Sequence, residues 1–146
     1  MQKLLHFDSP VQHYRAEACV VSCFDARFDP AVRRFLKRRG VAVADHVKIA
    51  GAASWLASPE QEDDRDFVLR QIRTSMRRHG SERVMLFLHS DCGAYGGLAS
   101  FQNDPACELA AMRAELASAE RFVRLSEPAL EVESYFVNFE GVWTAA

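Results

Sequence analysis

Short apolar segments alternate with amphipathic segments along this chain. Strand-like content, β-branched and aliphatic, occurs at 18–23, 41–49, 83–88 and 130–139. Apolar residues recur at helical spacing in the intervals between them, at 29–39, 58–79 and 104–125. Alternating strands and helices are typical of a parallel sheet whose right-handed crossovers cover both faces. The pattern therefore predicts a three-layer α/β fold, with a mostly parallel sheet of about four to five strands flanked by helices.

Turn and capping residues set the predicted ends of the helices. Asp29 can accept hydrogen bonds from the free amides of the first helix, with a proline at the first helical position. A capping box of Ser58 and Gln61 predicts that the second helix begins at Ser58, after a loop of small residues at 50–54. Asp104, again followed by proline, predicts the start of the third helix.

The length and net charge of the chain indicate which kinds of binding partner to expect. The 146 residues, 49% of them hydrophobic, fit a single domain spanning 1–146. The 18 Lys and Arg nearly balance the 20 Asp and Glu, for a net charge of −2, so we expect no nucleic acid and no membrane surface as partner. No apolar run approaches the ~18 residues of a membrane span. The first eight residues lack the apolar core of a signal peptide, and we expect a cytoplasmic protein with a small-molecule substrate.

Four cysteines are too few for a disulfide scaffold, so we expect free thiols in a reducing compartment. Cys19 lies within an apolar strand and Cys107 within an alanine-rich helix, and both are expected to pack in the core. Cys23 and Cys92 differ from them because Cys23 ends a predicted strand at a polar loop, and Cys92 lies within the polar loop after another predicted strand. These two are therefore candidate ligands or nucleophiles.

Two polar loops carry the candidate chemistry. Cys23, Asp25 and Arg27 follow the first strand, and His89 and Cys92 follow the third. In open α/β sheets, ligands bind beyond the carboxyl ends of the strands, so the two loops can share one crevice. Two thiolates and one imidazole are ligands that Zn²⁺ prefers, and three protein ligands with an open fourth position are the catalytic pattern. The sequence thus predicts a zinc site formed by Cys23, His89 and Cys92.

Asp25 and Arg27 suit a supporting pair beside such a site. Zinc lowers the pKa of a bound water to roughly 7–9, which gives a hydroxide nucleophile. Arg27 can hold the Asp25 carboxylate in a forked hydrogen bond while the other carboxylate oxygen accepts the proton of the zinc-bound water. A structural ion pair at the strand end is the alternative interpretation, and the residues alone leave both open.

The segments Cys23–Arg27 (Cys-Phe-Asp-Ala-Arg) and His89–Gly93 (His-Ser-Asp-Cys-Gly) together resemble the zinc-site signature of the β-class carbonic anhydrases. The likeness extends more weakly over about 18–141 and is closest to short, bacterial-type members. The resemblance implies a parallel α/β sheet with a late edge strand, and a homodimer or higher homo-oligomer.

The same resemblance implies a mechanism. Cys23, His89 and Cys92 would bind zinc, and hydroxide on the metal would convert CO2 to bicarbonate. Asp25, paired with Arg27, would orient the zinc-bound water. Some family members place this aspartate on the metal as an inactive fourth ligand, so Asp25 is also a candidate ligand.

This sequence departs from the family pattern at three places. It reads Lys48–Ala52 (Lys-Ile-Ala-Gly-Ala) where typical members read Arg-Asn-Ala-Gly-Asn, and Tyr14–Ala16 where Gln-x-Pro is frequent. Only 22 residues precede Cys23, so we expect the helical arm that commonly embraces a partner subunit to be short or missing. Because the three ligands are present and the departures lie elsewhere, we expect zinc binding to be retained and CO2 hydration to be less efficient than in typical members.

Three alternative functions are compatible with the same residues. The substrate can be a CO2 analogue, carbonyl sulfide or carbon disulfide, hydrolysed on the same metal site. A non-catalytic zinc protein would also retain the ligands. A thiol enzyme using Cys92 at a helix N-terminus is a more distant alternative; its phosphatase version needs an arginine six positions later, where this chain has Leu98.

Overall fold

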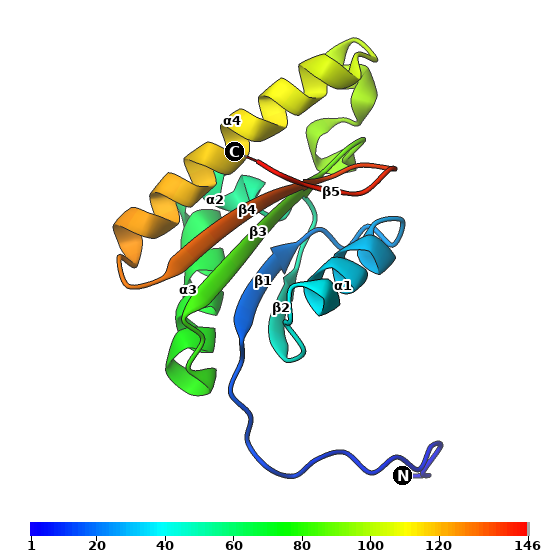
Figure 1. The fold of residues 1–146 in the computed structure, drawn as a ribbon, viewed down its shortest axis with the longest axis vertical. Helices are drawn as coiled ribbons and strands as arrows, with labels where there is room; N and C mark the ends of the chain where they lie inside the picture. The colour runs from blue at the N-terminus through cyan, green and yellow to red at the C-terminus, as the bar shows by residue number, and fades with distance from the viewer. Residues whose placement is uncertain (146) are drawn as a thin grey trace.

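Five strands form one sheet in the computed structural model, which describes residues 1–145 (Figure 1). The strands are β1 (Ala18–Ser22), β2 (Ala44–Lys48), β3 (Arg83–His89), β4 (Glu131–Val137) and β5 (Val142–Thr144), in the order β2-β1-β3-β4-β5. The first four run parallel, and β5 pairs antiparallel with β4. The predicted α/β class with a mostly parallel sheet is confirmed.

Helices cover both faces of the sheet (Figure 1). They are α1 (Asp29–Arg38), α2 (Ser54–Ala57), α3 (Glu62–His79) and α4 (Pro105–Ser126), with short 3-10 helices η1 (Gly93–Tyr95) and η2 (Leu98–Phe101) before α4. α1 packs on one face, whereas α2, α3 and α4 pack on the other. Within residues 1–145, no helix combines the length and apolar character needed to cross a membrane.

The central strand β3 is buried on both faces, which explains its continuous apolar sequence. Val84, Leu86 and Leu88 join the core under α2, α3 and α4, while Met85 and Phe87 join the core under α1. Because successive side chains of a strand point to opposite faces, His89 is directed toward α1 and the next residue toward α4. This alternation sends the two sides of the following loop to different layers of the molecule.

The predicted cap of α1 is wrong. Asp29 is the first residue of the helix, and Phe28 occupies the cap position without a side-chain hydrogen bond. The Asp29 carboxylate is instead held by Arg33, one turn along the helix, and by Lys48 at the end of β2. Two cations therefore take the oxygens that a capping aspartate would offer to backbone amides.

The predicted helix start at Ser58 is also wrong. α2 begins at Ser54, inside the small-residue stretch expected to be a loop, and α3 begins only at Glu62. A residue before proline is disfavoured in the α conformation, and Ser58, which precedes Pro59, has φ −140° and ψ 62°. Its hydroxyl donates to Glu115 on α4 at 2.5 Å, so it is not available to cap α3.

The C-terminal segment contains two strands where the sequence predicts one over 130–139. β4 ends at Val137, and Asn138 Oδ1 then accepts hydrogen bonds from the amides of Glu140 and Gly141 and from Trp143 Nε1. These bonds hold the turn that reverses the chain into β5. β5, not β4, is the late edge strand that the resemblance implies.

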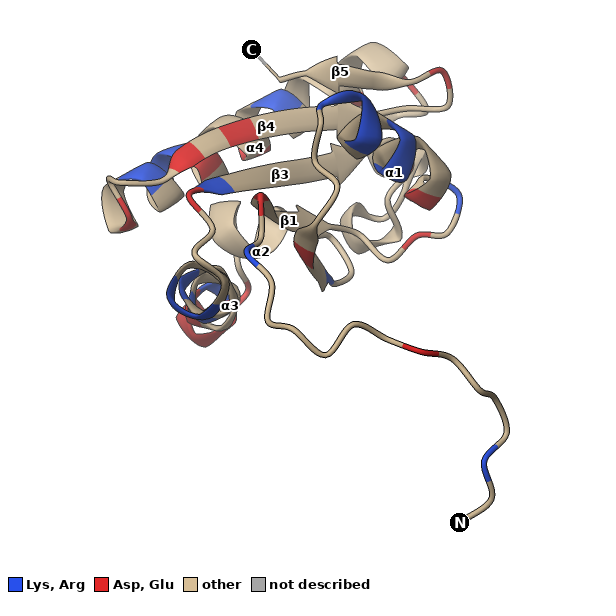
Figure 2. Ribbon diagram, turned by 60° about the horizontal axis from the view of Figure 1, so that its bottom comes forward, with Lys and Arg blue, Asp and Glu red and all other residues tan. Residues whose placement is uncertain are grey.

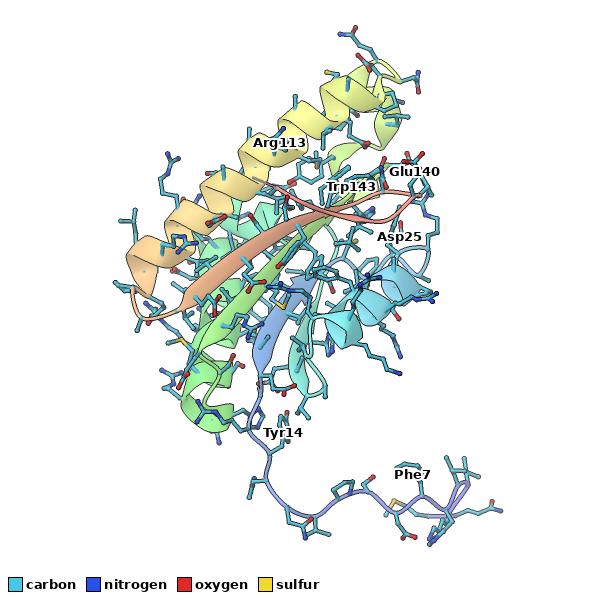
Figure 3. All side chains as sticks on the ribbon, in the orientation of Figure 1. Phe7, Tyr14, Asp25, Arg113, Glu140 and Trp143 are labelled. Atoms are coloured by element: carbon cyan, nitrogen blue, oxygen red, sulfur yellow. The ribbon has the colours of Figure 1, made fainter. Side chains whose placement is uncertain are left out.

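The N-terminal arm, residues 1–13, extends away from the sheet and is not helical (Figure 2). Its apolar side chains are exposed, including Phe7, which Figure 3 shows far from the body. The arm joins the domain at Tyr14, whose hydroxyl donates to Asp45 at 2.6 Å and whose ring lies 4.1 Å from that of His79. His79 also bonds Asp45, at 2.8 Å.

Candidate metal centre

The structure brings the two predicted loops together. β1 and β3 are neighbouring parallel strands, so Cys23, which follows β1, lies at the same sheet end as His89, the last residue of β3. Cys92 follows in the loop after β3. One donor atom from each of these three residues lies within 4.8 Å of the other two. Donors this close can be bridged by a single ion with bonds of ~2.0–2.3 Å.

His89 presents the nitrogen that a metal ligand needs. Its Nδ1 lies 2.8 Å from the Ser90 carbonyl oxygen, which can only accept, so Nδ1 carries the proton. Nε2 then has a free lone pair, and it is buried with no hydrogen-bond partner among the described residues. Buried polar atoms are rarely left unpaired. A metal ion between Nε2 and the two sulfurs fits both this unpaired nitrogen and the chemistry of the donor set.

The two cysteines shift each other's pKa. The neighbouring Cys92 thiol lowers the pKa of Cys23, and Cys23 raises the pKa of Cys92. Burial opposes the first shift and adds to the second, since Cys92 is only 3% exposed. A divalent cation held by both cysteines would need both sulfurs as thiolates, so its binding would release the thiol proton of Cys92.

Negatively charged and polar groups around His89 shift the pKa of its imidazole. Burial alone would lower the pKa of His89, but the pKa is raised because the Cys23 sulfur, the Ser90 carbonyl and the Asp25 carboxylate favour the imidazolium. The site therefore attracts positive charge, whether as a proton or as a metal ion.

Asp25 and Arg27 form the predicted forked ion pair. Arg27 Nη2 donates to Asp25 Oδ2 at 2.6 Å and Nε donates to Oδ1 at 3.0 Å, while the Arg27 amide also donates to Oδ1. The guanidinium lowers the pKa of Asp25 to about 2. In this arrangement Arg27 holds the Asp25 carboxylate. The role of Asp25 as catalytic group or fourth ligand stays a prediction.

Arg27 also reaches the second loop. Its Nη1 donates to Asp91 Oδ2 at 3.0 Å, and its Nη2 donates to the Asp91 carbonyl at 3.1 Å. The other Asp91 oxygen accepts from the Leu98 amide. Asp91 thus supports the loop that carries Cys92.

Two aromatic rings, Phe28 and Phe139, lie close to Arg27, and Phe28 also lies close to His89. Phe28 lies 4.5 Å from the His89 ring and 5.1 Å from Phe139, measured between ring centroids. The Arg27 guanidinium carbon lies 5.4 Å from the Phe28 centroid and 5.7 Å from that of Phe139. Phe139 belongs to the turn between β4 and β5, and Figure 3 shows its neighbour Glu140 at the same end of the molecule as Asp25. The sequence does not reveal this contribution, because its pattern does not show the β4–β5 turn.

The altered segment Lys48–Ala52 retains its glycine for a steric reason. Gly51 has φ +75°, and a Cβ atom there would lie 2.6 Å from Ser54 Oγ and 2.9 Å from Ala94 Cβ. Ala94 lies two residues after Cys92. The absence of a side chain at Gly51 therefore lets the segment Lys48–Ala52 pack closely against the loop that carries Cys92. Lys48, where the family pattern has arginine, pairs with Asp29.

The sequence pattern overlooks one residue near the site and misplaces another. Glu108, on α4, is 1% exposed and bonds the loop between His89 and Cys92. The available signal is its position four residues before Met112, in register with the apolar stripe of the helix. Cys107 is expected in the core but is exposed, because it stands one residue away from that stripe.

Comparisons with known proteins identify the family and the fold of this chain. A family model described as "Putative carbonic anhydrase" matches residues 14–145. A comparison with curated proteins gave no significant match.

Solved structures share the fold at low identity. A β-carbonic anhydrase from Trichomonas vaginalis superposes with a TM-score of 0.63 at 14% identity, covering 96% of this chain and 87% of that one. Carbonic anhydrase from Glaciozyma antarctica gives 0.59 at 19%, covering 94% and 85%. The apo form of a carbon disulfide hydrolase gives 0.55 at 14%, covering 91% and 80%. On the family match over residues 14–145, this chain belongs to the carbonic anhydrase family that the model describes.

Proposed function

We propose that this protein is a zinc-dependent lyase that hydrates CO2 reversibly to bicarbonate, with Cys23, His89 and Cys92 as the metal ligands. The observation that carries the proposal is the buried His89 Nε2, which lacks a hydrogen-bond partner among residues 1–145 and lies in one cluster with two cysteine sulfurs. Two thiolates would neutralise the two charges of the ion.

In this proposal, Asp25 and Arg27 have separate roles beside the metal. Zinc bound here supplies Lewis acidity that makes water a nucleophile near neutral pH. Asp25, whose pKa is about 2, stays ionised at that pH. It therefore acts as a hydrogen-bond acceptor that orients water and not as a store for its proton. Arg27 keeps the carboxylate in place through the fork of two donors.

The aromatic rings beside the site suit an uncharged substrate. The Phe28 and Phe139 rings flank Arg27, and apolar walls favour CO2 over charged anions. The same surfaces suit carbonyl sulfide and carbon disulfide, and a carbon disulfide hydrolase shares the fold. Competition between CO2 and these analogues at the loaded enzyme separates the two substrate classes.

The geometry gives little support to a thiol enzyme using Cys92. This side chain is 3% exposed, and its pKa is raised by the hydrogen bond to Cys23 and by burial. It precedes η1, a 3-10 helix of three residues, instead of an α-helix whose dipole would favour a thiolate.

A homodimer or higher homo-oligomer is part of the proposal. The β2 strand forms one edge of the sheet in the single chain, and the arm of residues 1–13 exposes Leu4, Leu5, Phe7 and Val11. Exposed edges and apolar side chains of this kind favour association with a second copy. Light scattering after size-exclusion chromatography measures the oligomeric state. Cytoplasmic location stays a prediction.

Metal analysis followed by stopped-flow CO2 hydration tests the function. We expect about one zinc per chain and measurable hydration, both lost in Cys92→Ser. Cys107→Ser is the matched control, because this cysteine is exposed and lies outside the metal cluster. Zinc without hydration in the wild type would support the non-catalytic alternative. A zinc-free protein with both thiols readily alkylated would rule out the proposal.

A further inference from the structure

A buried carboxyl group lies beneath the loop that carries two of the proposed zinc ligands. Glu108 on α4 is 1% exposed. Its Oε2 accepts a hydrogen bond from Ser90 Oγ at 2.5 Å, and its Oε1 accepts one from the Asp91 amide at 2.6 Å. Both partners stand between His89 and Cys92, so one side chain fixes the link between two ligands.

The contact with Asp91 stabilises an unfavourable backbone conformation. Asp91 has φ +53°, in the left-handed region that residues other than glycine seldom adopt. This residue turns the chain so that Cys92 comes back toward His89. Glu108 stabilises the turn by accepting a hydrogen bond from the Asp91 amide, which would otherwise lack this partner.

The contact with Ser90 acts on the histidine. The Ser90 carbonyl accepts a hydrogen bond from Nδ1–H of His89, which leaves the Nε2 lone pair free to bind metal. Glu108 holds the side chain of the same serine. The hydrogen-bonded series Glu108, Ser90, His89 therefore runs from the body of α4 to the metal-facing nitrogen.

Burial of this carboxyl group has no evident benefit for packing. Met112 and Leu116 continue the same stripe of α4 and are fully apolar, and an apolar residue at position 108 would extend the core. Removing a carboxyl group from water is costly unless it is well bonded. The position is explained by the groups that its two oxygens hold.

We propose that Glu108 is a positioning residue for the metal centre: it sets the His89–Cys92 loop so that the imidazole and the thiolate reach one ion. The inference rests on the proposed function and deepens it. Glu108 touches neither metal nor substrate and acts through Ser90 and Asp91.

The test compares Glu108→Leu with Glu108→Gln. Leucine removes both acceptors while keeping the apolar bulk. Glutamine keeps both bonds, because its amide oxygen accepts from the Asp91 amide and its NH2 group donates to Ser90 Oγ. Glu120→Leu is the control on the same helix, since Glu120 accepts from Ser134 and Arg124, away from the loop.

Three measurements are made on the full chain: the zinc dissociation constant by chelator competition, the visible spectrum of the Co²⁺-loaded protein, and hydrogen exchange of the Asp91 amide without metal. We expect Glu108→Leu to bind zinc about 10–100-fold more weakly, with a changed Co²⁺ spectrum and faster Asp91 exchange. Glu108→Gln should stay within a few-fold of wild type, and Glu120→Leu should leave all three unchanged.

The outcomes separate this inference from the proposed function. If wild type binds zinc and Glu108→Leu binds it equally well with the same Co²⁺ spectrum, the positioning role is wrong while the zinc site stands. Equal weakening by Glu120→Leu would reduce the effect to general stability and would likewise overturn the inference. A wild-type chain that binds no zinc defeats the proposed function, and the positioning role with it, even where Asp91 exchange responds to Glu108.

Discussion

Arg27 Nη1 lies 3.0 Å from Asp91 Oδ2, and this ion pair joins the two loops that supply the metal-site residues. The same guanidinium holds Asp25 through Nε and Nη2. One side chain from the loop after β1 thus fixes a carboxylate of its own loop and a carboxylate of the loop after β3. Parallel pairing aligns β1 with β3, and Arg27 ties the loop after one strand to the loop after the other.

Replacing Arg27 tests this bridge. In Arg27→Gln the fork is lost, so Asp25 is no longer held and the loops are joined less firmly. We expect kcat/KM for CO2 hydration to fall about 10–100-fold, with the zinc content retained. Arg33→Gln is the control, because Arg33 pairs with Asp29 on the exposed side of α1. An unchanged kcat/KM in Arg27→Gln would contradict the assigned role.

Asp25 has two interpretations that one substitution separates. Asp25→Asn keeps the shape but weakens the pair with Arg27, and an amide presents an NH2 group where a carboxylate oxygen accepts. A group that orients water should lose hydration activity by about 10²-fold or more when replaced. Asp91→Asn weakens the other ion pair of Arg27 and serves as the comparison. Equal, small losses in both variants would favour a purely structural ion pair.

Gly51 is expected to tolerate no side chain. Gly51→Ala places a methyl group against Ser54 Oγ and Ala94 Cβ at a φ of +75°. Gly40→Ala is a matched control with φ +74° and nothing within 4 Å of the added Cβ. Both variants should lose about 1 kcal/mol of unfolding free energy from backbone strain. Only Gly51→Ala should lose more and also bind zinc more weakly, as measured by urea unfolding and chelator competition; indistinguishable variants would refute the close contact.

Acid should remove the stability that the charged Asp45 carboxylate contributes where the N-terminal arm joins the domain. Burial would raise the pKa of Asp45, but the polar groups of Ser75, Tyr14 and His79 around it leave that pKa lowered. A lowered folded pKa gives stability that is present above the unfolded pKa of about 3.9 and is lost as pH falls through the folded value.

Urea unfolding of wild type and Asp45→Asn across this range measures the effect. The difference in unfolding free energy between the two proteins should shrink toward zero as the pH falls from about 3.9 through the lowered folded pKa of Asp45. A difference that does not change with pH would mean that the Asp45 charge contributes nothing.

The sheet and its helices could be predicted because each follows a local pattern. The apolar run of β3 and the glycines and prolines between segments determine where elements lie. The predicted start at Asp104 is confirmed, because its side chain accepts a hydrogen bond from the Ala106 amide at the beginning of α4. The other two predicted helix starts failed because a tertiary partner took the side chain. Lys48 takes Asp29, and Glu115 takes Ser58. No periodicity in the sequence reports such partners, because they come from elsewhere in the chain.

The site was predictable in its donors but not in its support. Cys23, His89 and Cys92 lie at or just beyond the carboxyl ends of β1 and β3, so parallel pairing brings them together. Phe139 and Glu108 reach the site from a reversed turn and from a buried helix face, 50 and 19 residues after His89 respectively. Glu108 stands at the first position of the buried stripe of its helix, four residues before Met112, and that position is the one signal the sequence offers for it.

X-ray absorption at the zinc edge of the purified protein tests the proposed metal site most directly. We expect two sulfur neighbours at ~2.3 Å, one imidazole nitrogen at ~2.0–2.1 Å and one further light atom. Cys92→Ser should remove a sulfur or the metal, whereas Cys107→Ser should leave the spectrum unchanged. A zinc ion without sulfur neighbours, or a spectrum indifferent to Cys92, would contradict the assignment of Cys23, His89 and Cys92 as ligands.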